Sequence, residues 1–233
     1  DDKISEAFET TGSKTIFLID HADIKCLWEP FSKLYANVYH IERNLYKNSL
    51  GSKLIFEEIN HDLELSYKYS WAVSEKYGFV RTSVLQSNSS ESKTISVLDG
   101  IQNIIPWGLE EYPQNTYSNL VDAYKKNELD KDTGIGIYSL SAVIVDRAEP
   151  SEALKANLAW SLGLESPNHL ITSAQVEAFR KGESISEEVD VRAERGAYFL
   201  SSSLSLEPNS SKTWRIVSDV NKSVTDVEFL KDL

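Results

Sequence analysis

Residues 63–74, LELSYKYSWAVS, decide the fold of this 233-residue chain. Large apolar residues stand at every second position from Leu63 to Val73, and the positions between them are polar, with Ala72 as the exception. Alternation with a period of two over this length predicts an antiparallel strand that has one solvated face and one face covering a core. Burying the six apolar side chains would contribute on the order of 10 kcal/mol, so we expect this strand to organise the sheet.

Further strands are predicted on both sides of this one, from apolar or alternating runs bounded by turn residues. They cover residues 14–19, 53–59, 79–86, 93–98, 134–146, 188–194, 196–206 and 212–220. Asp99-Gly100 is expected to end the strand before it in a turn. Residues 20–50 are read as a long irregular connection, and residues 152–163 fit either helix or strand. The pattern predicts a mainly β fold, an antiparallel two-layer sandwich with a few short helices.

Helices are predicted at three places. Residues 115–128 carry an apolar stripe, and capping-box patterns open the other two helices, at 172–182 and at 225–233. A helix that begins so near the end of the chain has little to pack against. We therefore expect residues 1–222 to form one domain and residues 223–233 to begin a helical linker to further protein.

Composition and charge exclude several classes of protein. With 41% hydrophobic residues the chain can bury a full core. The net charge of −12 argues against a nucleic-acid-binding surface, which needs clustered Lys and Arg. Cys26 is the single cysteine, so no disulfide forms within the chain, and its apolar neighbours indicate an inert thiol. No stretch approaches the roughly 20 apolar residues of a membrane span, so no membrane partner is expected.

No motif for metal or cofactor chemistry is present in the sequence. His21, His40, His61 and His169 show no pairing at metal-ligand spacing, and each is read as a structural or surface histidine. There is no nucleophile elbow, phosphate-binding glycine loop or dinucleotide fingerprint. We expect neither a metal nor a cofactor.

Two pairs of carboxylates could serve a glycosidase, which needs two acids flanking one bond. Glu57 and Glu58 are adjacent on a predicted strand and should point to opposite faces, so they cannot act together on one bond. Asp146 and Glu149 flank Arg147, which favours an ion-paired strand end over a general acid. Neither pair predicts catalysis, and no catalytic residue is assigned.

The stretch from Asp99 to Gly108, DGIQNIIPWG, is the most site-like part of the sequence. It is expected to place Gln102, Asn103 and Trp107 on a connection after a strand. Aromatic faces pack on the C–H face of a sugar ring and amides bind its hydroxyl groups, so these residues and Asp99 are candidate carbohydrate contacts. In the alternative reading Trp107 closes the end of the sandwich and the amides hold the turn.

A family resemblance is carried by four runs of sequence. They are residues 56–86 (FEEINHDLELSYKYSWAVSEKYGFVRTSVLQ), 98–108 (LDGIQNIIPWG), 136–161 (GIYSLSAVIVDRAEPSEALKANLAWS) and 194–220 (ERGAYFLSSSLSLEPNSSKTWRIVSDV). Together they resemble the amino-terminal region of large bacterial six-hairpin glycosidases and cellobiose-phosphorylase-like proteins. The resemblance implies a β-supersandwich of the galactose-mutarotase type, placed ahead of a helical (α/α) barrel that carries the catalytic acids. It leaves both the bacterial cytoplasm and the periplasm open as locations.

Three hypotheses follow for the function. The first, which we favour, is a non-catalytic β-sandwich domain of a larger glycoside hydrolase or phosphorylase, with the catalytic domain and a glycan as partners. The second is a free-standing carbohydrate-binding module in which Trp107 or Trp28 forms the platform. The third is a mutarotase-like or lyase-like enzyme working from the concave face of the sheet with His61 and Glu58. The lack of a His pair matching that of the mutarotases counts against the third hypothesis.

Overall fold

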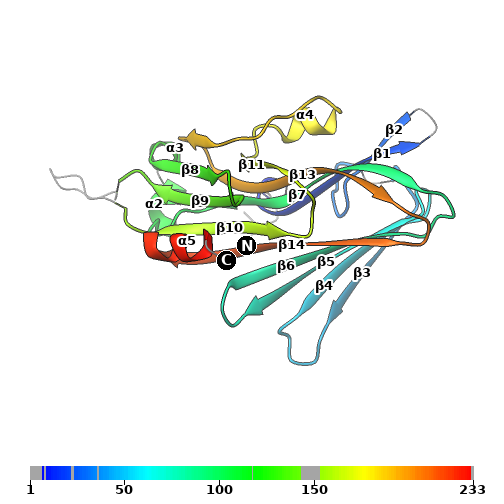
Figure 1. The fold of residues 1–233 in the computed structure, drawn as a ribbon, viewed down its shortest axis with the longest axis horizontal. Coiled ribbons are helices and arrows are strands. Elements are labelled where there is room, and N and C mark those ends of the chain that lie inside the picture. Colours follow the sequence, from blue (N-terminus) through cyan, green and yellow to red (C-terminus); the bar gives the residue numbers. More distant parts are fainter. Residues whose placement is uncertain are drawn as a thin grey trace.

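The chain was analysed as a computed structural model, which describes residues 7, 9–21, 24–35, 37–116, 118–142 and 153–231. Over these residues two antiparallel β-sheets pack face to face, and short helices lie on the outside (Figure 1). The mainly β, two-layer antiparallel fold expected from the sequence is confirmed. No helix in the described part of the chain is long and apolar enough to cross a membrane.

The smaller layer, sheet A, has five strands, and each neighbouring pair is antiparallel. In order across the sheet they are β11 (Asn168–Thr172), β13 (Gly196–Leu206), β7 (Lys93–Ile104), β1 (Gly12–His21) and β2 (Ile24–Trp28). The middle strand, β7, pairs along its length with β13 and along most of it with β1. Strands from the beginning, middle and end of the sequence therefore meet in this sheet.

The larger layer, sheet B, has nine strands. In order they are β12 (Asp190–Arg192), β8 (Lys125–Asp130), β9 (Ile135–Leu140), β10 (Ala156–Leu162), β14 (Ser211–Lys222), β6 (Gly78–Ser87), β5 (Leu65–Ser74), β4 (Leu54–Asn60) and β3 (Ile41–Lys47). The far ends of β3 to β6 project beyond sheet A (Figure 1). Sheet B is thus only partly covered by its partner layer.

Strand β5 behaves as its alternation predicts over its first half. Leu65 and Tyr67 are fully buried in the core between the sheets, together with Phe17, Trp214 and other residues of both layers. Farther along the same face, Trp71 is only half-buried and Val73 is 71% exposed. Sheet A does not reach that far, which is why a regular apolar pattern here does not give uniform burial.

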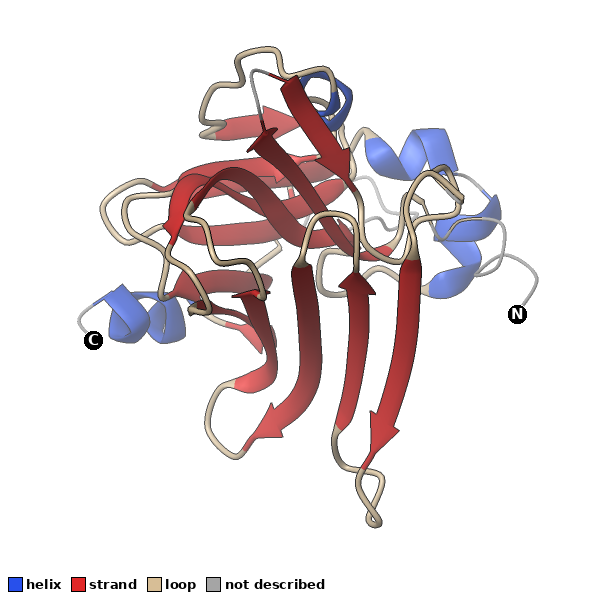
Figure 2. Cartoon of the chain, turned by 90° about the vertical axis from the view of Figure 1, so that its right-hand side faces the viewer, coloured by secondary structure: helices blue, strands red, loops and turns tan. Residues whose placement is uncertain are grey.

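The helices lie at the periphery of the sandwich (Figure 2). They are α2 (Glu111–Thr116), α3 (Ser118–Asp122), α4 (Val176–Arg180) and α5 (Val224–Lys231). Helix α4 packs Phe179 on the outer face of sheet A, against Phe199 and its neighbours. Helix α5 packs Val227 on the outer face of sheet B, against Ile135 and Leu158. Helices α4 and α5 therefore each cover part of one outer face of the sandwich.

Two stretches have more strand than the sequence predicted. Residues 20–50 were expected to be irregular, but they contain β2 and β3 at the edges of the two sheets. Residues 115–128 were expected to be one helix, but helix ends at Asp122 and β8 begins at Lys125. Lys125 and Asn127 are almost fully buried, so pairing of β8 with β9 and packing of this strand outweigh its helical pattern.

The prediction that Asp99-Gly100 ends a strand is wrong. Strand β7 continues through both residues to Ile104 and pairs with β1 and β13 there. Gly100 is needed for contact rather than for a turn, because a Cβ atom at this position would lie 2.2 Å from the Tyr198 carbonyl oxygen.

The remaining local predictions have mixed outcomes. The ambiguous stretch 152–163 contains strand β10, and α4 is followed by Gly182 in the left-handed conformation, as expected. Helix α5 is confirmed, but its cap is Ser223 rather than Thr225, because Ser223 and Asp226 exchange hydrogen bonds across the first turn.

Candidate functional site

The residues singled out between Asp99 and Gly108 do not form one site in the structure. Asp99 is fully buried between the sheets, whereas Gln102 lies three residues farther along β7 and points to the other face of sheet A. The Gln102 amide donates to the Glu9 carbonyl oxygen at 2.9 Å. Asn103 adopts a left-handed backbone with φ of 57° and donates a long hydrogen bond to Thr11.

Trp107 is the member of this set that reaches the surface. Its side chain is 41% exposed, and the Lys155 ammonium lies 5.9 Å from the centre of its ring. Trp107 therefore stays a candidate contact by itself, without Asp99 or Gln102 beside it.

Asp99 is the centre of a buried hydrogen-bond network. One carboxylate oxygen accepts from Arg81 Nη1 at 2.7 Å and from the Trp214 indole at 2.6 Å, and the other accepts from the Thr15 hydroxyl at 2.6 Å. Arg81 is itself fully buried and also donates to Tyr67. Burial raises the pKa of Tyr67, and the charge of Asp99 adds to that effect. The network fixes the position of the two sheets and is closed to solvent.

A pocket with the equipment of a ligand site lies elsewhere, on the inner face of sheet B beside β2 and β3. We call it the Trp28 pocket; its volume is about 310 Å³. Its lining consists of Trp28, Glu29, Ser32, Tyr35, Asn37, Tyr39, Ile41, Arg43 and Glu58. Aromatic rings, two carboxylates, an amide and a guanidinium thus converge on one hollow, a composition typical of sites for polar ring-shaped ligands.

Glu58 holds the walls of the Trp28 pocket together. It is 1% exposed and accepts hydrogen bonds from the Trp28 indole at 2.8 Å, the Phe31 amide at 2.7 Å and Arg43 Nε at 2.7 Å. These donors belong to β2, the following connection and β3. Because a buried carboxylate is stable only when it is paired and hydrogen-bonded, Glu58 fixes all three segments.

Glu29 does the same on the other side of the pocket. It is 3% exposed, and both of its oxygens accept from the Arg180 guanidinium, at 2.8 and 2.9 Å. Lys14 donates to the same carboxylate at 2.7 Å. This bidentate pair ties the pocket to α4. Its strong pairing raises the pKa of Arg180 against the opposing effect of burial.

The connection between β2 and β3 supplies the accessible groups of the pocket. Phe31 and Asn37 both have left-handed backbones, with φ of 66° and 68°, which turn the chain back over β3 and β4. Asn37 is exposed, Tyr35 is half-buried, and the Arg43 side chain is 47% exposed. Burial raises the pKa of the phenols of Tyr35 and Tyr39, so both stay neutral hydrogen-bonding groups at physiological pH.

The geometry favours binding over bond cleavage. Glycoside hydrolysis needs one carboxyl group to deliver a proton and another to attack or activate water. In the Trp28 pocket each carboxylate is buried and already accepts from several donors: Glu58 from an indole, a backbone amide and Arg43, and Glu29 from Arg180 and Lys14. The exposed lining offers ring faces, an amide and a guanidinium, which can hold a sugar ring and its hydroxyl groups.

Among the described residues, none of the other candidate acids and histidines lines the Trp28 pocket. Glu57 points away from Glu58, to Lys68 at 2.8 Å on the outer face of sheet B, as predicted. The pair of Asp146 and Glu149 lies outside the described residues. His61 does not line the pocket; its exposed ring lies against His40, with 4.7 Å between centres.

No metal site is found in the described part of the chain. No group of three or more His, Cys, Asp or Glu residues there could hold an ion.

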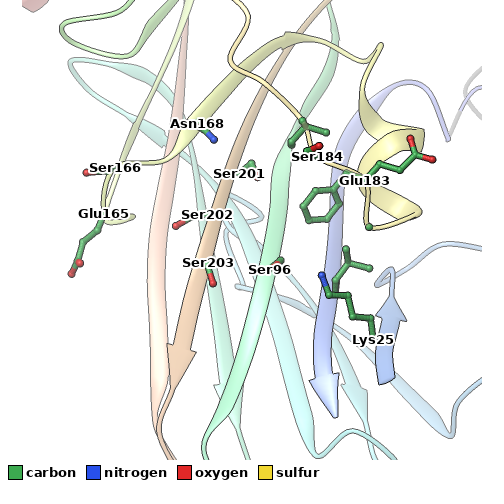
Figure 3. A pocket seen from close by; sticks show the side chains of 14 residues that line it. Lys25, Ser96, Glu165, Ser166, Asn168, Glu183, Ser184, Ser201, Ser202 and Ser203 are labelled. Carbon is green, nitrogen blue, oxygen red and sulfur yellow. The ribbon is translucent and has the colours of Figure 1, made fainter. Parts of the chain in front are cut away.

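A second hollow lies on the outer face of sheet A, beside α4 (Figure 3). Its volume is about 470 Å³, and hydroxyl groups dominate its lining, with Ser96 on β7 and Ser201 and Ser203 on β13. These serines are half-buried or exposed, and none of the lining polar groups is fixed by a buried ion pair. The groove is therefore less able to orient a ligand than the Trp28 pocket.

The sequence predicted only part of the Trp28 pocket. Trp28 was named as a possible platform and Glu58 as a possible acid, but they were not placed together. Arg43, Tyr35 and Asn37 were missed, because residues 20–50 were read as irregular. The aromatic density of that stretch was the available signal.

No family model and no curated protein matches this sequence. Among solved structures, the chain is similar to part of a polysaccharide lyase, with 11% identity, a TM-score of 0.51, and coverage of 95% of this chain and 27% of the lyase. Weaker likenesses are to a putative kojibiose phosphorylase from the human microbiome (12% identity, TM-score 0.42, covering 93% of this chain and 25% of that chain) and to the Slr1438 protein of Synechocystis sp. PCC 6803 (10% identity, TM-score 0.41, covering 88% and 73%).

The fold assignment rests on the first of these likenesses. At 11% identity it shows a shared β-sandwich fold and nothing more, and at that level the resemblance expected from the sequence is confirmed. The chain spans about a quarter of the length of the lyase and of the phosphorylase, at 27% and 25%.

Proposed function

We propose that this chain is a carbohydrate-associated β-sandwich domain of a larger carbohydrate-active enzyme, and that it binds glycan in the Trp28 pocket without cleaving it. The observation that carries the proposal is the fold likeness to a polysaccharide lyase, of which the chain matches 27%. A chain that matches 27% of such an enzyme has the size of one of its domains.

The Trp28 pocket supports the binding part of this proposal. Its volume of about 310 Å³ lies at the lower end of the range of about 300–1,000 Å³ for small-molecule sites. The ring of Tyr35 offers a face for the C–H groups of a sugar, and Asn37 and Arg43 offer donors for hydroxyl groups. The ligand class that these groups fit is a neutral sugar unit.

The exposed face of α5 supports a companion domain. Val227 is the buried residue of this helix, whereas Val224 and Phe229 are 69% and 54% exposed. We propose, as the sequence suggested, that residues 1–222 form the sandwich domain and residues 223–233 begin a linker to a helical catalytic domain. Reading the gene beyond Leu233 tests this: a helical-repeat region with paired carboxylates supports it, and an immediate stop codon favours a free-standing module.

Binding is tested by affinity electrophoresis of the chain through gels that contain neutral polysaccharides, followed by calorimetry with the best oligosaccharide. Tyr35→Leu removes the ring, and Asn37→Gly removes the amide while keeping the left-handed backbone. We expect each change to weaken binding roughly tenfold. Tyr46→Leu is the matched control, because Tyr46 is an exposed tyrosine on the outer face of the same sheet.

Three results would contradict the proposal. If no neutral polysaccharide retards the protein, or if Tyr35→Leu and Tyr46→Leu have the same effect, the Trp28 pocket does not bind glycan. Release of new reducing ends or unsaturated products by this chain alone would contradict the non-catalytic role.

A further inference from the structure

A third cavity lies on the outer face of sheet B, opposite the Trp28 pocket and between the sheet and α5; we call it the Trp160 pocket. Its volume is about 460 Å³. Ile135, Trp160, Val217 and Val80 form its floor, from four neighbouring strands, β9, β10, β14 and β6. The register places Val217 beside both Trp160 and Val80, so the floor is a continuous apolar row across the sheet.

The walls of the Trp160 pocket are aromatic and apolar. Tyr77, from the turn between β5 and β6, meets the Trp160 ring edge to face, with 6.1 Å between ring centres. Leu230 of α5 lines the pocket from the other side. Trp160 is half-buried, and its indole N–H makes no hydrogen bond to any described residue. A large ring face with a free donor is therefore open to a ligand.

The charge of this pocket is opposite to that of the protein as a whole. Its lining contains Arg215 and Lys231 and no carboxylate among the described residues, whereas the chain carries a net charge of −12. Lys231 is neutralised by Asp130 and Glu228, at 2.8 and 3.2 Å. Arg215 is exposed and makes no hydrogen bond or ion pair with any described residue.

An unpaired guanidinium next to an exposed indole selects for a particular ligand. The planar fork of Arg binds a carboxylate through two parallel hydrogen bonds, and the indole face packs on a sugar ring. The chain has 36 acidic and 24 basic residues, so most of its surface repels an anion. A local cationic site therefore attracts an anionic ligand to this pocket rather than to another part of the surface. A purely aliphatic ligand could pack on the apolar floor of the pocket but would leave Arg215 without a partner.

We propose that the Trp160 pocket binds a sugar acid, a uronate unit of an acidic polysaccharide, with its ring on Trp160 and its carboxylate on Arg215. This inference rests on the proposed function, because it assumes that the chain handles glycans. It adds a second site on the other face of the sheet and a charge class for its ligand.

Isothermal calorimetry with tetragalacturonate as the probe tests the proposal. We expect Arg215→Gln to weaken binding at least tenfold and Arg215→Lys to weaken it less, because Lys keeps the charge and loses the fork. Arg192→Gln is the matched control: it removes the same charge from an exposed arginine of β12 outside the pocket. Raising the salt concentration should weaken binding by the wild type more than by Arg215→Gln.

Each contrary result is distinct from failure of the Trp28 pocket. The inference is overturned if the wild type does not bind tetragalacturonate, if Arg215→Gln and Arg192→Gln act equally, or if the carboxyl-reduced tetrasaccharide binds as well as the acid. The proposed function is judged separately, on neutral polysaccharides and the Tyr35→Leu variant. A protein that passes that test and fails this one retains the proposed function and loses the uronate site.

Discussion

The buried network around Asp99 gives the sharpest test of the structure, through the substitution Asp99→Asn. Asn has nearly the same shape, so it creates no cavity. Its amide oxygen can still accept from Arg81 and Trp214, and its NH₂ group can face the hydroxyls of Thr15 and Tyr67, which can rotate to accept. What the substitution removes is the negative charge opposite Arg81.

The magnitude follows from the burial of that pair. Arg81 and Asp99 are both 0% exposed and lie 2.7 Å apart. Removing one partner of a fully buried ion pair leaves an uncompensated charge and costs about 3–5 kcal/mol. Arg81 cannot relieve this charge by losing a proton, because a guanidinium stays protonated in proteins. For a chain of this size the loss corresponds to a fall in Tm of about 6–20 °C.

Urea unfolding followed by tryptophan fluorescence measures the effect. We expect a lower midpoint with an unchanged m-value, and glycan binding that is unaltered in the folded protein. The double variant Asp99→Asn with Arg81→Met is the control, since it removes the unpaired guanidinium while the Asn amide oxygen still accepts from Trp214. A loss below about 1 kcal/mol for Asp99→Asn, or a double variant less stable than the single one, would refute the buried-pair argument.

Three further predictions concern single residues. Burial lowers the pKa of His169 below its ordinary value of 6.5, against the opposing effect of Glu187. As the pH drops below 6.5 the unfolded chain binds a proton at this residue before the folded chain does, so the free energy of unfolding should fall. His169→Gln should flatten this pH dependence in urea titrations. Gly100→Ala should destabilise the protein by about 3 kcal/mol or more in the same titrations, because the new Cβ would lie 2.2 Å from a carbonyl oxygen; a loss under 1 kcal/mol would show that β7 and β13 are less closely packed. Trp107→Ala should leave stability within about 1 kcal/mol, because the side chain is 41% exposed, and any fall in glycan affinity would assign Trp107 to a binding surface.

The sequence predicted the strands well wherever a period of two coincided with burial on one face. β5, β6, β13 and β14 are of this kind, and their predicted bounds differ from the observed ones by a few residues at most. It failed where the cause of a conformation lies in a distant part of the chain. Asp99-Gly100 has the composition of a turn, but pairing with the distant strands β1 and β13 keeps it in the middle of a strand.

The Trp28 pocket was hidden for the same reason. Glu58 lies on a predicted strand and Trp28 in a supposed loop, and nothing local indicates that a 2.8 Å hydrogen bond joins them. Arg180, which fixes Glu29, is 151 residues away in sequence. Pairs of this separation are set by the packing of whole sheets, which single-sequence patterns do not encode.

The two pockets use opposite faces of one sheet, and this arrangement limits how they can act together. Arg43 pairs with Glu58, and Glu58 pairs with the core residue Tyr67, so these side chains face the sandwich interior. Trp160 and Val217 pair with each other and directly follow the core residues Ala159 and Ile216 on their strands, so they face outward. No lining residue is shared, so no single sugar unit can touch both sites. Free-energy changes from Tyr35→Leu and Arg215→Gln should therefore add within about 0.5 kcal/mol on any glycan long enough to reach both sites. Coupling beyond that would mean that sheet B moves as ligand binds, and that is the motion the buried Asp99 network should prevent.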